Sequence, residues 1–207
     1  MASVLRPLKG NVDGKFKILI VGNCGTGKTT LQARLSNLLK IPGASMDQFR
    51  WLPNWEAAPK DVFRARIETY MSTNLSWILD GNSSSVVFNL AHAEATDVIW
   101  LDPPFLLYYP RLLLRTFTRI LRFHPAGSLP DGCYETIRNV FFDSESVLWW
   151  GFLGHWKRRG QYEPFLRTES VELGGKWRRI GGWGSELRRW LCAIEYMVTP
   201  STTARNS

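Results

Sequence analysis

Short apolar runs alternate along the chain with longer segments in which apolar residues recur every three to four positions. The short runs have the length of buried strands, and they cover residues 16–21, 43–46, 77–80, 98–101 and 176–180. The longer segments have the periodicity of amphipathic helices, and they cover residues 28–40, 59–74, 84–94, 105–123, 134–158 and 185–197. Strands and helices in alternation predict an α/β fold, with a parallel sheet covered by helices on both faces.

The domain organisation follows from the length and from where this pattern stops. A chain of 207 residues with 44% hydrophobic residues is long enough for one core with an inserted subdomain. We expect a single domain over residues 15–197, with a lid insert at about 123–165. Residues 1–14 are polar and predict a flexible arm, and residues 198–207 predict a disordered tail.

The first apolar run leads directly into a segment with the spacing Gly-x-x-x-x-Gly-Lys-Thr, from Gly22 to Thr29. A strand before such a segment and a helix after it are the setting of a phosphate-binding loop. Backbone N–H groups of the loop and the helix N-terminus attract phosphate, Lys28 reaches the β and γ phosphates, and Thr29 binds Mg²⁺. The expected nucleotide-binding residues are Gly22, Asn23, Cys24, Gly25, Thr26, Gly27, Lys28, Thr29 and Thr30.

Three later apolar runs end at or just before an aspartate, namely Asp47, Asp80 and Asp102. Because the carboxyl ends of parallel strands share one edge of a sheet, these carboxylates should lie beside the loop. Asp80 is the candidate for holding Mg²⁺ together with Thr29, and Asp47 for orienting or deprotonating the acceptor of a phosphoryl group. Each aspartate has the alternative role of capping a turn. For Asp102, which precedes two prolines, we favour the structural role.

Arginines recur at steps of four, four and three in the segment 105–123, as Arg111, Arg115, Arg119 and Arg122. This spacing places them on one helix face. The opposite face is apolar and carries Leu112, Leu113, Phe117, Ile120 and Leu121. Since the segment follows the fourth strand, Arg111 and Arg115 are candidate catalytic residues on a hinged lid that closes over the transferring phosphate. The alternative is a solvated helix face.

The charge and the cysteines restrict the setting in which the protein works. A net charge of +8 suits anionic ligands, without choosing among nucleotides, nucleic acids and acidic membranes. Three widely spaced cysteines without zinc-ligand spacing are typical of a reducing compartment. No apolar run approaches the length of a membrane span, and residues 1–15 lack the apolar stretch of a signal peptide. We therefore expect a cytoplasmic protein without a membrane partner, and we expect a monomer.

Tryptophan is unusually frequent, with ten in the chain. Those in polar or punctuated surroundings are Trp51, Trp55, Trp149, Trp150 and Trp156. Most large aromatic residues close a hydrophobic core, so a role in binding a ligand is the minority alternative for any one of them.

Three motifs together resemble a known family. They are Asp47-x-x-x-Trp51-x-Pro53-x-Trp55, Trp77-Ile-Leu-Asp80-Gly81-Asn82, and Leu101-Asp102-x-Pro104 followed by Arg111. In this order they resemble the adenylate-kinase-like P-loop kinases of the DNA topology modulation protein type, over roughly residues 16–160 and more weakly over 176–191. The resemblance implies a nucleoside-monophosphate-kinase-like fold, with a five-stranded parallel sheet of order 2-3-1-4-5 and a small lid. It also implies ATP and Mg²⁺ as cofactors.

The chain departs from that family at two places. Ser83 stands where the family usually has tyrosine, and no lysine or arginine occurs between Arg66 and Arg111. Adenylate-type kinases hold the phosphate of the acceptor with an arginine in that region. Either Arg50 replaces this arginine, or the acceptor carries no phosphate.

These observations favour an ATP-binding phosphotransferase that acts, with Mg²⁺, on a small molecule or a nucleotide that the sequence does not identify. One alternative is a nucleoside triphosphatase; a GTPase is disfavoured because no Asn-Lys-x-Asp motif occurs. Another is a nucleotide-binding protein associated with nucleic acid, through the basic cluster at residues 157–159 and the arginines at 178, 179, 188 and 189. No DNA-binding motif supports that alternative.

Overall fold

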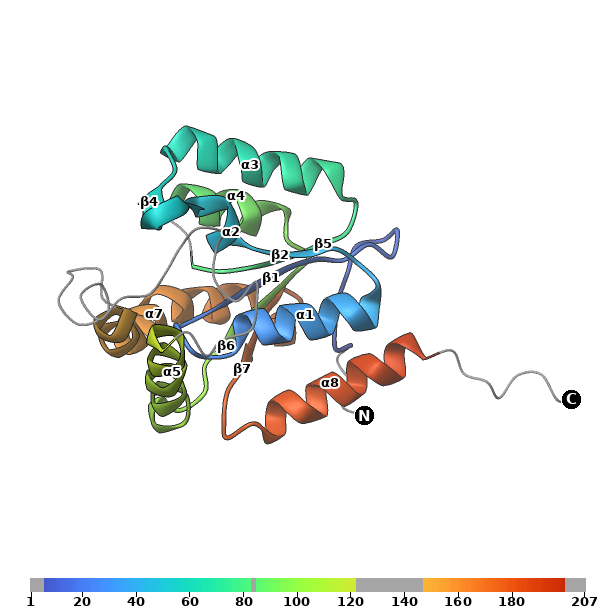
Figure 1. Ribbon diagram of the computed structural model, residues 1–207. Helices are drawn as coiled ribbons and strands as arrows, with labels where there is room; N and C mark the ends of the chain where they lie inside the picture. The colour runs from blue at the N-terminus through green and yellow to red at the C-terminus, as the bar shows by residue number, and fades with distance from the viewer. Residues whose placement is uncertain (1–5, 83–84, 122–146, 200–207) are drawn as a thin grey trace, which may run out of the picture.

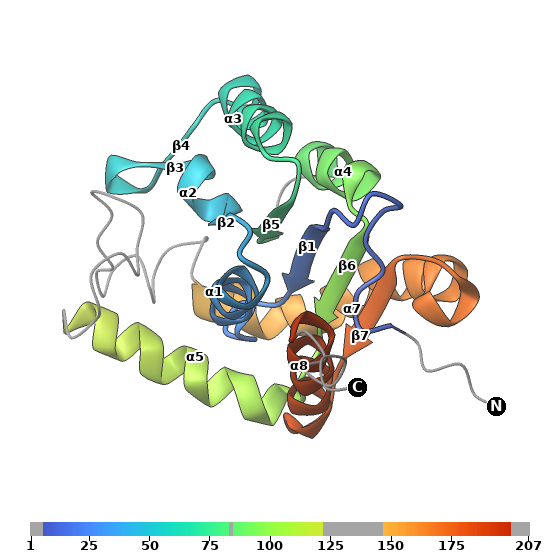
Figure 2. The same cartoon turned by 90° about the vertical axis from the view of Figure 1, so that its right-hand side faces the viewer.

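The computed structural model describes residues 6–82, 85–121 and 147–199, and a five-stranded parallel sheet forms its centre (Figures 1 and 2). The strands of this sheet are β1 (Lys17–Gly22), β2 (Gly43–Ser45), β5 (Trp77–Asp80), β6 (Asp97–Leu101) and β7 (Trp177–Ile180). Their order across the sheet is β2-β5-β1-β6-β7. Numbered along the chain, the five strands have the order 2-3-1-4-5, so the expected fold class and strand order are confirmed.

Helices cover both faces of the sheet (Figure 2). They are α1 (Lys28–Leu39), α3 (Lys60–Thr73), α4 (Ser85–Glu94), α5 (Phe105–Ile120), α7 (Val147–Glu169) and α8 (Ser185–Val198). Buried residues of α3, α4 and α7 belong to one hydrophobic cluster, and those of α1 and α8 belong to another. Each cluster fills the space between one face of the sheet and its helices.

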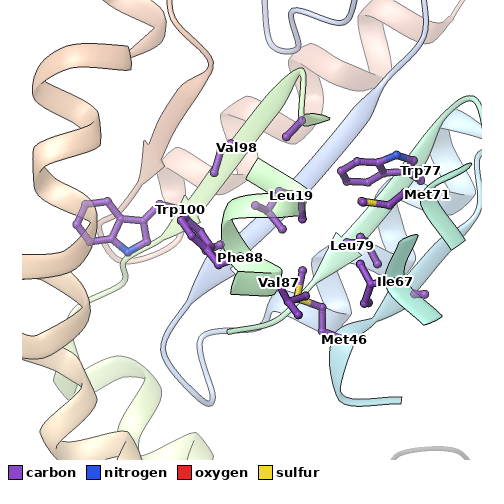
Figure 3. Packing of buried hydrophobic residues seen from close by; sticks show 14 of the residues in the cluster. Leu19, Met46, Ile67, Met71, Trp77, Leu79, Val87, Phe88, Val98 and Trp100 are labelled. Carbon is purple, nitrogen blue, oxygen red and sulfur yellow. The ribbon is translucent and has the colours of Figure 1, made fainter. Parts of the chain in front are cut away.

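The alternation of side chains along β1 explains why both faces are covered. Leu19 and Val21 belong to the cluster beneath α3 and α4, which Figure 3 shows from close by, whereas Ile18 and Ile20 belong to the cluster beneath α1 and α8. All four side chains are 0% exposed. Because burying such a side chain contributes about 1.5–3 kcal/mol, a strand that is apolar on both faces is stable only at the centre of a covered sheet.

The N-terminal residues differ from the expected flexible arm. Leu8 is 1% exposed within the cluster beneath α1 and α8. The backbone N–H groups of Lys9 and Gly10 donate to the buried carboxylate of Asp97, at 2.6 and 3.0 Å. Residues 8–10 are therefore held against the domain, because they fill a gap in the core and satisfy a buried charge. Residues 1–5 of the expected arm lie outside the described part of the chain.

Helix α7 continues well past residue 158, where the sequence pattern predicts a helix to end. A proline and several glycines interrupt the apolar periodicity of α7. The sequence pattern therefore does not show that the helix continues. Tyr162 is 1% exposed, and its ring centroid lies 5.6 Å from that of Trp177. The later turns of α7 are thus part of the core, so the lid insert expected at 123–165 extends too far. Residues 122–146 of that insert lie outside the described residues.

Residues 46–57 form defined elements where the sequence suggests a strand end and a loop. A short helix α2 (Met46–Arg50) is followed by a hairpin of β3 (Trp51–Leu52) and β4 (Glu56–Ala57), joined by a turn of 3-10 helix over Pro53–Trp55. The Ala58 N–H donates to the Arg50 carbonyl at 2.9 Å and closes the hairpin. Segments this short lack a readable period, so only their packing defines them.

In the described part of the chain, none of the helices combines the length and the apolar character that crossing a bilayer requires.

Candidate functional site

The loop between β1 and α1 has the backbone of a phosphate-binding loop. Gly22 has φ +148°, and a Cβ there would meet the Leu101 carbonyl oxygen at 2.5 Å, so only glycine fits. Gly27 has φ +93° and caps α1, and the first N–H groups of this helix are available to an anion. Glycines at these two positions allow the chain to fold back sharply between strand and helix.

Lys28 crosses back over the loop that precedes it. Its ammonium donates to the Asn23 carbonyl at 2.8 Å, and the Thr26 hydroxyl donates to the same oxygen at 2.8 Å. An ammonium has three donors, so Lys28 can bind phosphate oxygens while it keeps this contact. Thr29 lies in the first turn of α1 and is exposed.

Asn23, expected among the nucleotide-binding residues, anchors the loop instead with its side chain. The residue is buried, and its amide donates to the Tyr108 hydroxyl at 2.8 Å and to the Gly151 carbonyl at 2.6 Å. Tyr108 lies on α5 and Gly151 on α7, so both helices hold the loop. The Tyr108 hydroxyl also contacts Nδ1 of His155 at 3.2 Å. Desolvation raises the pKa of Tyr108 and lowers the pKa of His155, which favours the neutral form of both groups.

Asn82 holds the loop from the side of β5. Its amide bonds the carbonyl of Gly22 and its Oδ1 accepts from the N–H of Gly22, at 2.5 and 3.4 Å. The Tyr162 hydroxyl donates to the same Oδ1 at 3.2 Å. Neither Asn82 nor Tyr162 is among the site residues expected from the sequence. For Asn82 a signal existed, because it ends the Asp-Gly-Asn motif; for Tyr162 none did.

Asp80 has the environment of a residue that holds a hydrated cation. It ends β5 and is 1% exposed, and neither carboxylate oxygen has a hydrogen-bond partner within the described residues. A buried carboxylate without a partner is costly. Mg²⁺ prefers carboxylate oxygens and keeps several of its waters, so Asp80 fits a cation bound through water. Across the described residues, no group of three or more histidine, cysteine or acidic side chains forms an all-protein metal site.

Asp47 lies in the first turn of α2 among four charged side chains. Desolvation raises its pKa, because protein atoms displace water around the carboxyl group even though part of the residue is exposed. The charge of Asp80 raises the pKa further, and the charges of Lys28, Arg50 and Arg115 lower it. These electrostatic neighbours place four of the expected site residues, Lys28, Asp47, Asp80 and Arg115, in one region.

The two candidate arginines of α5 differ. Both are exposed, but only Arg115 is among the charges that act on Asp47. Helix α5 buries Tyr108, Leu112 and Thr116, while Phe117 remains 51% exposed. The face that α5 turns toward the domain therefore lies beside its arginines rather than opposite them.

Asp102 has a structural role, as expected from its position before two prolines. Its carboxylate is 7% exposed and forms ion pairs with Arg159 of α7 and Arg179 of β7. The Arg179 guanidinium also lies 5.0 Å from the ring centroid of Trp100. These contacts fasten α7 to the ends of β6 and β7, and thereby hold Gly151 and Tyr162 in place near the loop.

Comparisons with known proteins identify the fold. No protein-family model matches the sequence, and no curated protein is similar to it in sequence. A shikimate kinase from Acinetobacter baumannii in complex with shikimate is 16% identical, with a TM-score of 0.51, over 91% of this chain and 96% of that kinase. A gluconokinase from Sinorhizobium meliloti 1021 is 12% identical, with a TM-score of 0.49, over 89% of this chain and 95% of that kinase.

The DNA topology modulation subtype that the sequence resembles is not among these structural neighbours. The sheet order, the loop after β1 and the similarity to shikimate kinase together show that this chain has the fold of the P-loop kinases.

Proposed function

We propose that the protein is a kinase that transfers the γ-phosphoryl group of ATP to a small molecule, with Mg²⁺ as cofactor. The observation that carries this proposal is the strand register, in which Asp80 lies opposite Ile20 of β1 and Ser45 of β2, so the loop after β1 and both aspartates share one edge of the sheet. In agreement with this, the charges of Lys28 and Asp80 act on Asp47. A lysine that can bind phosphate, a carboxylate suited to a hydrated cation and a second carboxylate that can act as a base are the groups that phosphoryl transfer requires.

The donor half of the site would hold the nucleotide by its phosphates. N–H groups of the loop and of the first turn of α1 bind phosphate oxygens, and Lys28 adds a positive charge. Thr29 and Asp80 are the residues that fit Mg²⁺, which, when bound, neutralises charge that develops on the phosphates. Arg115 would stabilise the same charge.

The acceptor half would use Asp47 as general base. The acceptor oxygen forms a bond to the γ-phosphorus while the bond to the β–γ bridging oxygen breaks, and ADP leaves. Asp47 orients the acceptor hydroxyl and takes its proton. Because a base works best when its pKa approaches the working pH, the raised pKa of Asp47 suits this role.

Product analysis separates a kinase from a nucleoside triphosphatase. ADP and inorganic phosphate are both measured while the full chain is incubated with Mg²⁺, ATP and a panel of hydroxyl compounds. We expect one acceptor class to increase ADP without an equal release of phosphate. Lys28→Ala should abolish the increase, and Lys60→Ala, which changes an exposed lysine outside the site, should leave it unchanged. Equal release of ADP and phosphate with every compound would contradict the proposal.

Three of the basic residues considered for a nucleic-acid partner are used in contacts within the domain. Arg159 and Arg179 are paired with Asp102, and Arg178 donates to the Arg6 carbonyl. Arginines that are used in internal contacts are poor candidates for binding a phosphate backbone.

A further inference from the structure

The hairpin over residues 51–57 presents two tryptophans that do not belong to the core. Within the described residues, Phe49 and Leu52 pack against the cluster beneath α3 and α4, whereas Trp51 and Trp55 are outside that cluster. Both indoles are half-buried, with ring centroids 5.6 Å apart and an angle of 77° between the ring planes. Two rings this close leave no space for a third ring between them, so they form an aromatic corner.

The backbone of the hairpin is strained in a way that fixes this corner. Asn54 and Trp55 have φ of 63° and 62°, and two successive residues other than glycine in the left-handed region are uncommon. Such strain persists only where surrounding contacts hold it, and it is concentrated at functional sites. The pairing of β3 with β4 and the bond from the Arg66 guanidinium to the Phe49 carbonyl supply those contacts.

Arg50 connects this corner to the reacting carboxylate. Its guanidinium lies 4.9 Å from the ring centroid of Trp51, and its charge acts on Asp47. A guanidinium stacked on an indole keeps its donors at the edge of the ring, where it can bind a carboxylate or a phosphate through two parallel bonds. The chain has no lysine or arginine between Arg66 and Arg111, so that segment offers no alternative cation.

We propose that Trp51, Trp55 and Arg50 form the acceptor subsite, and that the acceptor is a small ring compound with a hydroxyl group and an anionic group. This proposal rests on the kinase function proposed above. Arg50 binds the anion, the indole corner packs against the C–H face of the ring, and the hydroxyl reaches Asp47. The step is the phosphoryl transfer already described, with the hydroxyl proton passing to Asp47.

Direct binding tests the subsite without requiring turnover. Glucuronate, glucose 6-phosphate and glucose share one ring and differ in the anionic group, so they are titrated into the full chain in the presence of a non-hydrolysable ATP analogue and Mg²⁺. We expect both anionic probes to bind at least about tenfold more tightly than glucose, since hydrogen bonds between charged groups are strong. Binding of only one anionic probe identifies the anion as carboxylate or phosphate and supports the subsite. Equal affinity for all three probes, or no binding of any, would overturn it.

Variants separate anion recognition from a general effect of charge. Arg50→Ala should weaken binding of the anionic probes about tenfold to a hundredfold. Arg50→Lys keeps the charge beside Asp47 but lacks the planar fork, so it should restore binding only in part. Arg64→Ala, which removes an exposed arginine paired with Glu68, is the matched control. An equal loss for Arg50→Ala and Arg64→Ala would contradict the proposal.

The aromatic corner has its own control. Trp51→Ala should weaken binding of all three probes and Trp51→Phe should restore it in part, whereas Trp183→Ala, at a residue that is 67% exposed, should have no effect. Unchanged affinities in Trp51→Ala would overturn the role of the corner. A different result would contradict the proposed kinase function and leave the subsite standing. In that case the wild-type chain binds the anionic probes, but neither these probes nor any compound of the acceptor panel receives a phosphoryl group.

Discussion

The side chain of Asn82 and the backbone of Gly22 are joined by two hydrogen bonds, although 60 residues separate them in the chain. This contact ties the turn after β5 to the first residue of the phosphate-binding loop. The carboxylate of Asp80 lies two residues before Asn82, so the same turn positions both the loop and the candidate ligand of Mg²⁺.

Asn82→Ala should lower the affinity for ATP more than it lowers the stability of the fold. The substitution removes both bonds to Gly22, and each ordinary hydrogen bond contributes about 0.5–1.5 kcal/mol. We expect ATP affinity to fall about fivefold to tenfold, as measured by calorimetric titration. Asn74→Ala, which removes a bond to the Tyr70 carbonyl, is the control and should change thermal stability without changing ATP affinity. Equal effects of the two variants on ATP affinity would contradict the role of Asn82.

Asp80→Asn should have opposite effects on stability and on activity. In the absence of Mg²⁺, the variant removes a buried charge that has no partner in the described part of the protein, so its denaturation midpoint should rise. Phosphoryl transfer should fall by about two orders of magnitude or more, because loss of charge stabilisation in a closed site has effects of that size. Chemical denaturation with and without Mg²⁺ measures the first effect. A variant less stable than wild type in the absence of Mg²⁺ would show that Asp80 has a structural partner.

The acid limb of the pH–rate profile should report Asp47. Desolvation is the main cause of the raised folded-state pKa of this carboxyl group. On acidification, activity should therefore be lost at a higher pH than it would be with an ordinary aspartate, whose pKa is about 3.9. Arg115→Ala removes a charge that lowers this pKa, so the limb should move to still higher pH. An unmoved limb in that variant would separate Arg115 from Asp47.

Asp47 should also affect stability with a definite sign. Since its pKa is higher in the folded than in the unfolded state, the folded protein binds the proton more tightly. Asp47 therefore costs stability at neutral pH, and this cost disappears as the pH falls below the unfolded pKa. Asp47→Asn should be more stable than wild type at neutral pH and should lose this advantage in acid. Urea titrations at the two pH values measure the difference.

His92 should make the domain sensitive to mild acid. Its Nε2 accepts a hydrogen bond from the Trp177 indole at 2.9 Å, and its pKa is lowered by burial and then by the charge of Lys176. A lowered pKa means that the unfolded state binds the proton more tightly, so stability should fall as the pH drops below the ordinary value near 6.5. His92→Gln, which cannot titrate, should reduce that slope; His155 accounts for a remaining part. An unchanged slope would exclude His92.

Local patterns in the sequence are enough to predict the sheet, and they also indicate the candidate donor half of the site. The apolar run before Gly22, the glycine spacing up to Lys28, and the aspartate that follows Ile78 and Leu79 are each readable within a few residues. In a parallel sheet their positions at strand ends imply that they meet, because all the strands end at one edge. In the structure, the charges of Lys28 and Asp80 both act on the carboxyl group of Asp47.

Only the tertiary structure decided which other residues support the site. Asn82 and Tyr162 reach the loop from distant parts of the chain, Arg115 and not Arg111 acts on Asp47, and Leu8 completes the core. These relationships depend on how helices and strands pack over long separations, and no local periodicity encodes them. The candidate phosphate-binding loop can therefore be predicted from the sequence, while the contacts that hold it arise only when the whole domain is packed.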